Sequence, residues 1–143
     1  MLEQAIIYEN TFEKARKLIN ENKNKTIIFS SNDDELNRKI LEKLQIQILL
    51  INLAGKKDFQ KQRDSGFNQV LAKIAKEKNV AIGINFDEII QASQYEKQKI
   101  ISRIQQNVAL CNKKRKFKFK IPVTFRNFSN KNKCKIYELF FRH

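Results

Sequence analysis

Few residues in this sequence have the types and spacing that catalysis requires. The single histidine, His143, is the last residue, and two distant cysteines do not complete a zinc ligand set. Asp87 and Glu88 follow a predicted strand, where α/β active sites often lie, but their position favours a solvated turn. Residues 33–35 (DDE) are better explained as a helix cap. No P-loop and no G-x-G-x-x-G motif occurs, so we predict no catalytic residue, metal site or cofactor in this chain.

The residues that could do chemistry are cations placed to contact phosphate. Residues 111–120 (CNKKRKFKFK) hold six basic side chains and no acidic one. Phe117 and Phe119 interleave with the lysines, so bases could stack on them, but strand alternation favours a core position for both rings. A second group of basic residues lies on a predicted loop and helix. The candidate nucleic-acid-binding residues are therefore Lys57, Lys61, Arg63, Lys73, Lys78, Lys113, Lys114, Arg115, Lys116, Lys118 and Lys120.

The charge of the chain is large and unevenly distributed. The formal net charge is +14, and residues 91–135 carry 13 basic and 1 acidic side chains. Residues 1–55 carry 8 of each and cancel. A solubilising surface would be spread more evenly, so this concentration favours a polyanionic partner, with nucleic acid as the leading class.

The bulk composition indicates one globular domain, residues 1–143. Hydrophobic residues make up 41% and charged residues 31% of the 143 positions. No apolar run approaches the roughly 20 residues that span a bilayer. The start, MLEQAIIYEN, has no basic segment typical of a signal peptide, so we expect a cytoplasmic protein without membrane contact and with reduced thiols at Cys111 and Cys134.

Apolar runs and helical periodicity alternate along the chain. Helices are expected to begin at Asn10 or Thr11, at the 32–35 capping box, at Asp64 or Ser65, and at Ser93. The predicted buried positions of the last two helices are Phe67, Val70, Leu71, Ile74 and Ala75, then Ile100, Ile101, Ile104, Val108 and Cys111. The predicted strands are residues 5–8, 26–30, 46–52, 80–84 and 117–125.

This alternation predicts an α/β fold with about five parallel strands joined by right-handed crossovers. A complete eight-stranded barrel typically needs about 250 residues, so five strands cannot close one. We therefore expect a partial barrel or an open α/β sheet. At least one edge needs a cover, supplied either by the aromatic tail at 136–143 (IYELFFRH) or by a partner.

Residues 63–83 (RDSGFNQVLAKIAKEKNVAIG) resemble the signature of ribonuclease P protein component 3, an archaeal and eukaryotic family. In that family the segment turns through D-x-G, here Asp64 and Gly66, and enters a helix reading N-Q-V-L-A-K, here residues 68–73. It then leads into a strand like N-V-A-I-G, here residues 79–83. Residues 89–104 and 120–125 resemble the family's next helix and strand. The chain is shorter than is usual in the family, and its ending after residue 125 departs from the family pattern.

The resemblance implies a TIM-barrel-like fold related to the PHP phosphoesterases and a role as an RNA-binding subunit of ribonuclease P. That ribonucleoprotein removes 5′ leaders from precursor tRNA. The resemblance also implies that chemistry and magnesium belong to the RNA. Expected partners are the ribonuclease P RNA, precursor tRNA, the component 2 (Pop5-like) protein and other ribonuclease P proteins. It further implies that Arg63, Lys73 and Lys78 support the RNA.

Two other functions fit the same sequence. The chain could be a basic α/β module that binds another RNA, such as rRNA. This alternative differs from the ribonuclease P subunit only in the RNA that is bound. A PHP-type metal-dependent phosphoesterase is the less favoured alternative, because its metal site needs several histidines and the chain has one.

Overall fold

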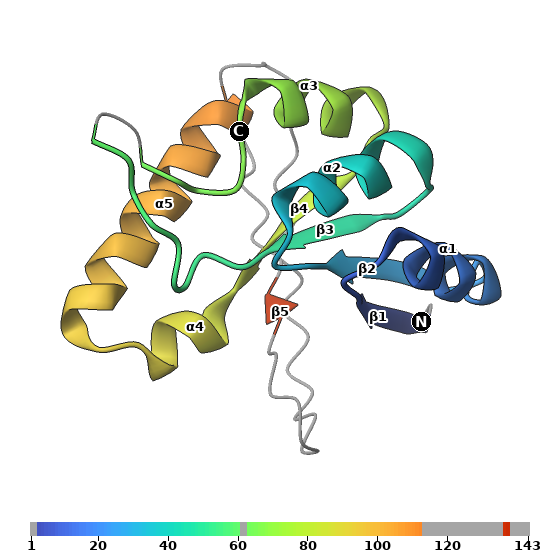
Figure 1. The fold of residues 1–143 in the computed structure, drawn as a ribbon, viewed down its shortest axis with the longest axis horizontal. Helices are drawn as coiled ribbons and strands as arrows, with labels where there is room; N and C mark the ends of the chain where they lie inside the picture. The colour runs from blue at the N-terminus through green and yellow to red at the C-terminus, as the bar shows by residue number, and fades with distance from the viewer. Residues whose placement is uncertain (1–2, 61–62, 113–135, 138–143) are drawn as a thin grey trace.

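The computed structural model describes residues 3–60, 63–112 and 136–137, and within these ranges strands and helices alternate (Figure 1). The elements are β1 (Gln4–Tyr8), α1 (Phe12–Glu21), β2 (Thr26–Ser30), α2 (Asp34–Lys43), β3 (Ile48–Ile51), α3 (Gln69–Glu77), β4 (Ala81–Asn85), α4 (Phe86–Gln91), α5 (Gln94–Asn112) and β5 (Ile136–Tyr137). None of the described helices combines the length and the apolar content that a bilayer crossing requires.

The strands form one sheet in the order β1-β2-β3-β4-β5. The first four are parallel neighbours, which confirms the prediction for that part of the sheet. The prediction of five parallel strands is not confirmed. The expected strand at 117–125 lies outside the described residues, and β5 pairs antiparallel with β4, with Ile84 opposite Tyr137. Two residues of the aromatic tail therefore lie at the β4 edge.

The two faces of the sheet carry separate sets of buried side chains. One face, with Phe29 and Leu49, packs with buried residues of the helices into a large core cluster. The other face carries a small cluster of Ile28, Ile48, Leu50 and Ala81. Side chains alternate along a strand, so neighbouring residues of β2 and β3 enter different clusters. The helices α1, α2 and α3 lie together on one side of the sheet (Figure 1).

Polar side chains cap the starts of α2, α3 and α5, whereas Thr11 makes no side-chain capping bond at the start of α1. The helix α2 starts within the predicted 32–35 box, but its cap is Asp33 and not Asn32. The Asp33 carboxylate accepts from the Glu35 and Leu36 backbone N–H groups at 2.9 and 3.3 Å. The Ser93 hydroxyl accepts from the Glu96 N–H at 3.4 Å at the start of α5. For α3 the predicted cap at Asp64 or Ser65 is wrong, because Asn68 caps the helix by accepting from the Leu71 N–H at 3.0 Å.

Three predictions of exposure are also wrong. Val70 and Ile101 were expected in the core, but they expose 51% and 44% of their surface. Ala72 in α3 and Arg103 in α5 are buried, although neither was predicted to be. Asp87 does not begin a solvated turn, because it is buried in the first turn of α4, where its N–H donates to the Asn85 side chain at 3.1 Å.

Candidate nucleic-acid interface

The β3–α3 loop, residues 52–68, is the longest described connection between neighbouring strands and helices, although residues 61–62 lie outside the described ranges. It leaves the carboxyl end of β3, the edge of a parallel sheet where α/β proteins bind ligands. Lys57, Phe59 and Arg63 are exposed on it. Side chains of α5 and α2 contact this loop and hold its conformation.

Arg103 of α5 is the main anchor of this loop. Its side chain is only 1% exposed. One guanidinium nitrogen donates to the Leu53 carbonyl at 3.2 Å, and the other donates to the Lys56 carbonyl at 2.8 Å and to Asp58 Oδ1 at 3.1 Å. Hydrogen bonds from a charged donor are stronger than neutral ones, so one buried side chain fixes three successive parts of the loop.

Asp58 joins the two halves of the loop. Its Oδ1 accepts from Arg103 and also from the Asp64 backbone N–H at 3.0 Å. Burial alone would raise the pKa of Asp58, but the Asp64 N–H and the Arg103 guanidinium outweigh burial and lower the pKa. Asp58 is therefore a charged acceptor whose negative charge is neutralised locally.

The D-x-G turn has a specific structural role. The Asp64 carboxylate accepts from the Gly66 N–H at 3.0 Å, and Gly66 has a positive φ of 63°. A Cβ on Gly66 would lie 2.9 Å from Lys56 Cε and Nζ. That amine lies 2.9 Å from each carboxylate oxygen of Asp34 in α2. Gly66 thus leaves room for an ion pair between the loop and α2, and Lys56 is engaged inside the fold.

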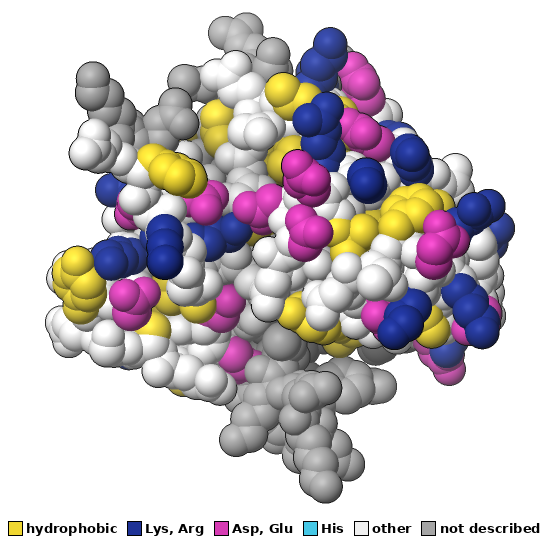
Figure 2. Space-filling model, in the orientation of Figure 1, with side chains coloured by type: hydrophobic (Ala, Val, Ile, Leu, Met, Phe, Trp, Pro, Cys, Tyr) yellow, Lys and Arg dark blue, Asp and Glu magenta, His cyan; other side chains and the backbone are white. Residues whose placement is uncertain are grey.

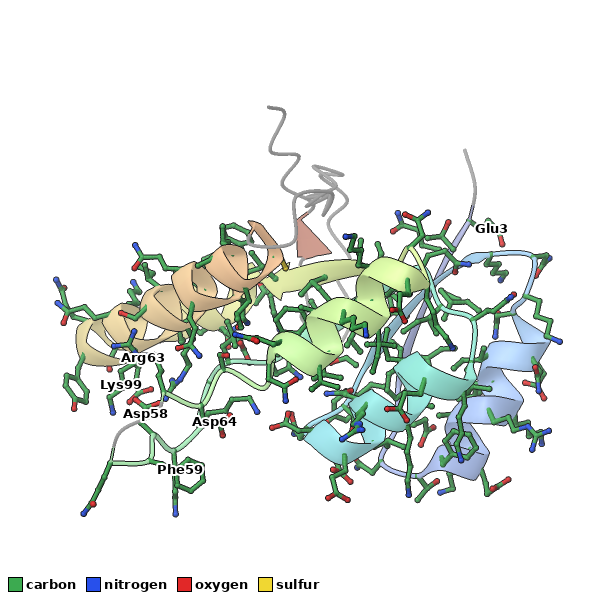
Figure 3. All side chains as sticks on the ribbon, turned by 90° about the horizontal axis from the view of Figure 1, so that it is seen from above. Glu3, Asp58, Phe59, Arg63, Asp64 and Lys99 are labelled. Atoms are coloured by element: carbon green, nitrogen blue, oxygen red, sulfur yellow. The ribbon has the colours of Figure 1, made fainter. Side chains whose placement is uncertain are left out.

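Two more side chains of α5 support the second half of the loop. Gln106 donates to the Arg63 carbonyl at 3.3 Å and to the Ser65 hydroxyl at 3.4 Å. The buried Asn107 donates to the Ser65 carbonyl at 3.4 Å. These contacts use loop backbone, so the Arg63 side chain remains at the surface next to the Asp58 carboxylate (Figure 3).

The structure separates the predicted RNA-binding residues that it describes. Lys57 and Arg63 are exposed on the loop at the carboxyl edge. Lys73 is exposed on α3 and lies 4.0 Å from Glu77. Lys78 follows α3 and donates to the Glu42 carbonyl, at the opposite edge of the sheet. The nine residues of α3 span about 13 Å, so Lys78 does not join the loop cations. Lys61, Lys113, Lys114, Arg115, Lys116, Lys118 and Lys120 lie outside the described residues.

The face formed by α1, α2 and α3 carries charges of both signs. Lys and Arg side chains alternate there with Asp and Glu, without a large field of one sign (Figure 2). Some of these charges pair along a helix, as Arg38 does with Glu42 at 2.8 Å. This face resembles an ordinary solvated surface, so we expect phosphate contact at the loop rather than here.

The carboxyl edge of the sheet is lined by amides and hydroxyls that bond to one another. Asn52 donates to the Ser30 hydroxyl at 3.1 Å and to Asn32 at 3.4 Å, and Asn85 donates to Asn52 at 3.4 Å. Glu88 accepts from the Leu53 N–H at 2.8 Å, and burial raises the pKa of this carboxyl. The described residues contain no group of three or more side chains suited to hold a metal ion.

Arg103 is the loop-anchoring residue that sequence reasoning missed. It lies in the apolar helical series of Ile100, Ile104 and Val108, at the spacing of a buried position. An arginine in such a series needs a buried partner, and the 53–58 backbone supplies it. The signal was therefore present in the periodicity of α5.

Comparisons with known proteins confirm the resemblance predicted from residues 63–83. A scan against models of protein families finds no match. Curated relatives include ribonuclease P protein component 3 of Methanococcus maripaludis strain C7, 29% identical over 105 residues, which are 73% of this chain and 42% of the relative. The same component of Methanococcus vannielii is 24% identical over 109 residues, 75% of this chain and 45% of the relative. The chain thus spans less than half the length of these relatives.

A solved structure shares the fold. A chain in the cryo-EM structure of archaeal ribonuclease P with mature tRNA superposes with a TM-score of 0.65 and 23% sequence identity. The match covers 78% of this chain and 47% of that chain. The strand and helix arrangement described above is therefore one found within a ribonuclease P particle.

Proposed function

We propose that this chain is an RNA-binding protein subunit of ribonuclease P that supports the catalytic RNA in removing 5′ leaders from precursor tRNA. The observation that carries this proposal is the similarity to relatives named ribonuclease P protein component 3 across 73% of the chain. Catalysis and magnesium then belong to the RNA, and this chain needs no cofactor of its own. The two edge carboxylates support that division, since Glu88 accepts backbone N–H groups and Asp87 is buried in α4.

The strand order supports a partial TIM-barrel-like fold. A doubly wound sheet reverses its strand order and places helices on both faces. Here the parallel strands run β1-β2-β3-β4 without reversal, as successive units of a barrel do. The small cluster around Ile28 and Leu50 would then face the barrel interior, and α1, α2 and α3 would form its outer layer.

The proposed mechanism is electrostatic. Lysines and arginines neutralise phosphates, counterions are released, and the RNA is stabilised in its active fold. The anchored loop holds the backbone of Lys57 and Arg63 in place, so binding has to order only their side chains. The basic run at 113–120, which lies outside the described residues, would add further phosphate contacts. Lys73 and Lys78 would contribute separately, from the surface and far end of α3.

The proposed partners are the ribonuclease P RNA, precursor tRNA, the component 2 (Pop5-like) protein and other ribonuclease P proteins. Reconstitution tests this directly. Adding the chain together with component 2 to ribonuclease P RNA should increase cleavage of precursor tRNA at moderate magnesium. No gain in cleavage would reject the assignment. If the chain instead stabilised the fold of rRNA, a module for another RNA would be favoured.

A matched pair of double variants sharpens the experiment. Lys57→Glu with Arg63→Glu reverses two loop cations, and we expect it to abolish most of the gain in cleavage. Lys17→Glu with Arg16→Glu makes the same change on the exposed face of α1 and should leave the gain intact. Equal losses in both pairs would mean that total charge, and not the loop, supports the RNA.

A further inference from the structure

We propose that Phe59 is a stacking platform for an unpaired RNA base, with Lys57 and Arg63 contacting the adjoining phosphates. The inference rests on the proposed RNA binding and adds the chemistry of the ligand at one position. The β3–α3 loop would then bind single-stranded nucleotides through a base as well as through phosphates.

The first observation is the exposure of the Phe59 ring. It exposes 73% of its surface, more than any other large apolar side chain in the described residues. The ring lies at the outer end of the loop, while Asp58 and Arg63 lie closer to α5 (Figure 3). A single exposed apolar residue is common on protein surfaces, so exposure alone does not define a site.

The second observation is that the backbone around this exposed ring is held in place. The residue before Phe59 is Asp58, which accepts hydrogen bonds from Arg103 and from the Asp64 N–H at 3.1 and 3.0 Å. The Lys56 carbonyl accepts from Arg103 at 2.8 Å, and the Lys56 amine is paired with Asp34. A ring on a flexible backbone would cost backbone entropy on binding, whereas the backbone that leads into Phe59 is already held.

The third observation is the charge around the ring. Lys57 is exposed two residues before Phe59, and Arg63 is exposed on the returning half of the loop. The negative charge of Asp58 faces Arg103, which lowers the pKa of that carboxyl and offsets its repulsion of phosphate. Exposed aromatic rings with cations on either side are the combination that binds single-stranded nucleic acid, since every base has a face to stack.

A protein partner is the other class that could cover Phe59. The cores of protein–protein interfaces are depleted of lysine, and buried unpaired cations are unfavourable there. Lys57 has no acidic partner within the described residues that would neutralise it in such a core. These charges therefore favour RNA.

The chain contains no tryptophan, which permits a direct optical test. Phe59→Trp places a single tryptophan at the site, and a base stacking on it should quench its fluorescence. We expect saturable quenching by a mixed-sequence single-stranded oligoribonucleotide. Heparin, a polyanion without bases, should bind without quenching. Tyr8→Trp, at a ring that is 49% exposed on β1, is the matched control and should not respond.

Affinities measured with the same oligoribonucleotide complete the test. Phe59→Ala should weaken binding about tenfold, because stacking of one base contributes roughly that factor to the affinity. Phe59→Tyr keeps an aromatic face and should retain the affinity of the parent chain. Unchanged affinity in Phe59→Ala, or equal quenching by heparin, would overturn the inference. Loss of component 2 association with unchanged RNA affinity would assign Phe59 to a protein partner. If the parent chain binds no RNA at all, the proposed function itself fails.

Discussion

At the residue scale, the loop depends on one buried arginine and the carboxylate that it contacts. Arg103 is 1% exposed and makes three hydrogen bonds to residues 53–58, whereas Asp58 is 37% exposed and holds both halves of the loop. Lysine and arginine are not equivalent here, because only the planar guanidinium reaches the Leu53 and Lys56 carbonyls and Asp58 at once.

Arg103→Met should lower the free energy of unfolding by about 2–4 kcal/mol, because two carbonyls and one carboxylate lose their donor while the side-chain volume is kept. Arg38→Met is the matched control. Arg38 is 57% exposed and pairs with Glu42 within α2, so its replacement should change the free energy of unfolding far less than that of Arg103. Urea unfolding followed by circular dichroism measures both, and equal losses would contradict the anchoring role.

The acid stability of the chain should depend on Asp58. Its pKa in the folded state lies below the ordinary value of 3.8, so the charged form stabilises the folded state. The stability that it contributes is present above pH 3.8 and is lost as the pH falls through the lower folded-state pKa. The difference in unfolding free energy between the parent chain and Asp58→Asn should therefore shrink across that acid range. A pH-independent difference in urea titrations would rule out this linkage.

At the element scale, the signature segment proves to be a turn followed by a helix that starts later than its sequence suggests. Asp64 and Ser65 are typical capping residues, but Asp64 accepts from the Gly66 N–H, and the Ser65 hydroxyl donates to the Phe67 carbonyl at 3.1 Å. Both side chains thus stabilise the turn, and Asn68 is left to cap α3. Local propensity could not decide which of these residues caps the helix, because Asp, Ser and Asn side chains can each bond to nearby backbone groups in a turn or at a helix start.

Gly66→Ala should destabilise the chain more than Gly55→Ala. Both glycines have positive φ, 63° and 71°, so each substitution carries a backbone penalty of about 1–2 kcal/mol. A Cβ on Gly55 would meet nothing within 4 Å, whereas one on Gly66 must also displace the Lys56 amine from Asp34. Thermal unfolding of the two variants measures the difference. Equal shifts in Tm would mean that the Lys56–Asp34 pair adds no stability.

At the scale of the whole molecule, charge and fold are distributed differently along the chain. The described helices α1, α2 and α3 present mixed charges, while the excess of positive charge belongs to residues 91–135. A scaffold with balanced charge and a cationic segment can bind a polyanion without self-repulsion throughout its surface.

Replacing Lys113, Lys114, Arg115 and Lys116 with glutamine should weaken RNA binding without unfolding the protein. About six phosphate contacts on single strands would give the parent chain a log–log salt slope near −4, and the slope should become shallower by about 0.7 for every phosphate that the variant no longer neutralises. Filter binding across a salt series measures the slope. A loss of the circular dichroism signal in this variant would show that the basic run is structural, and a flat salt response in the parent chain would contradict phosphate binding.

Sequence alone determined the four parallel strands, the helix start within residues 32–35, the cap at Ser93, and the resemblance to ribonuclease P protein component 3. Those features follow from the spacing of apolar residues, from local hydrogen-bonding groups and from residue identity. All three can be recognised within a short segment of sequence. Only the tertiary structure decided that Arg103 is buried, that Lys56 is paired and that Phe59 is presented on an anchored loop. These depend on contacts between residues 22 to 50 positions apart, and no local pattern specifies which distant partner neutralises a charge.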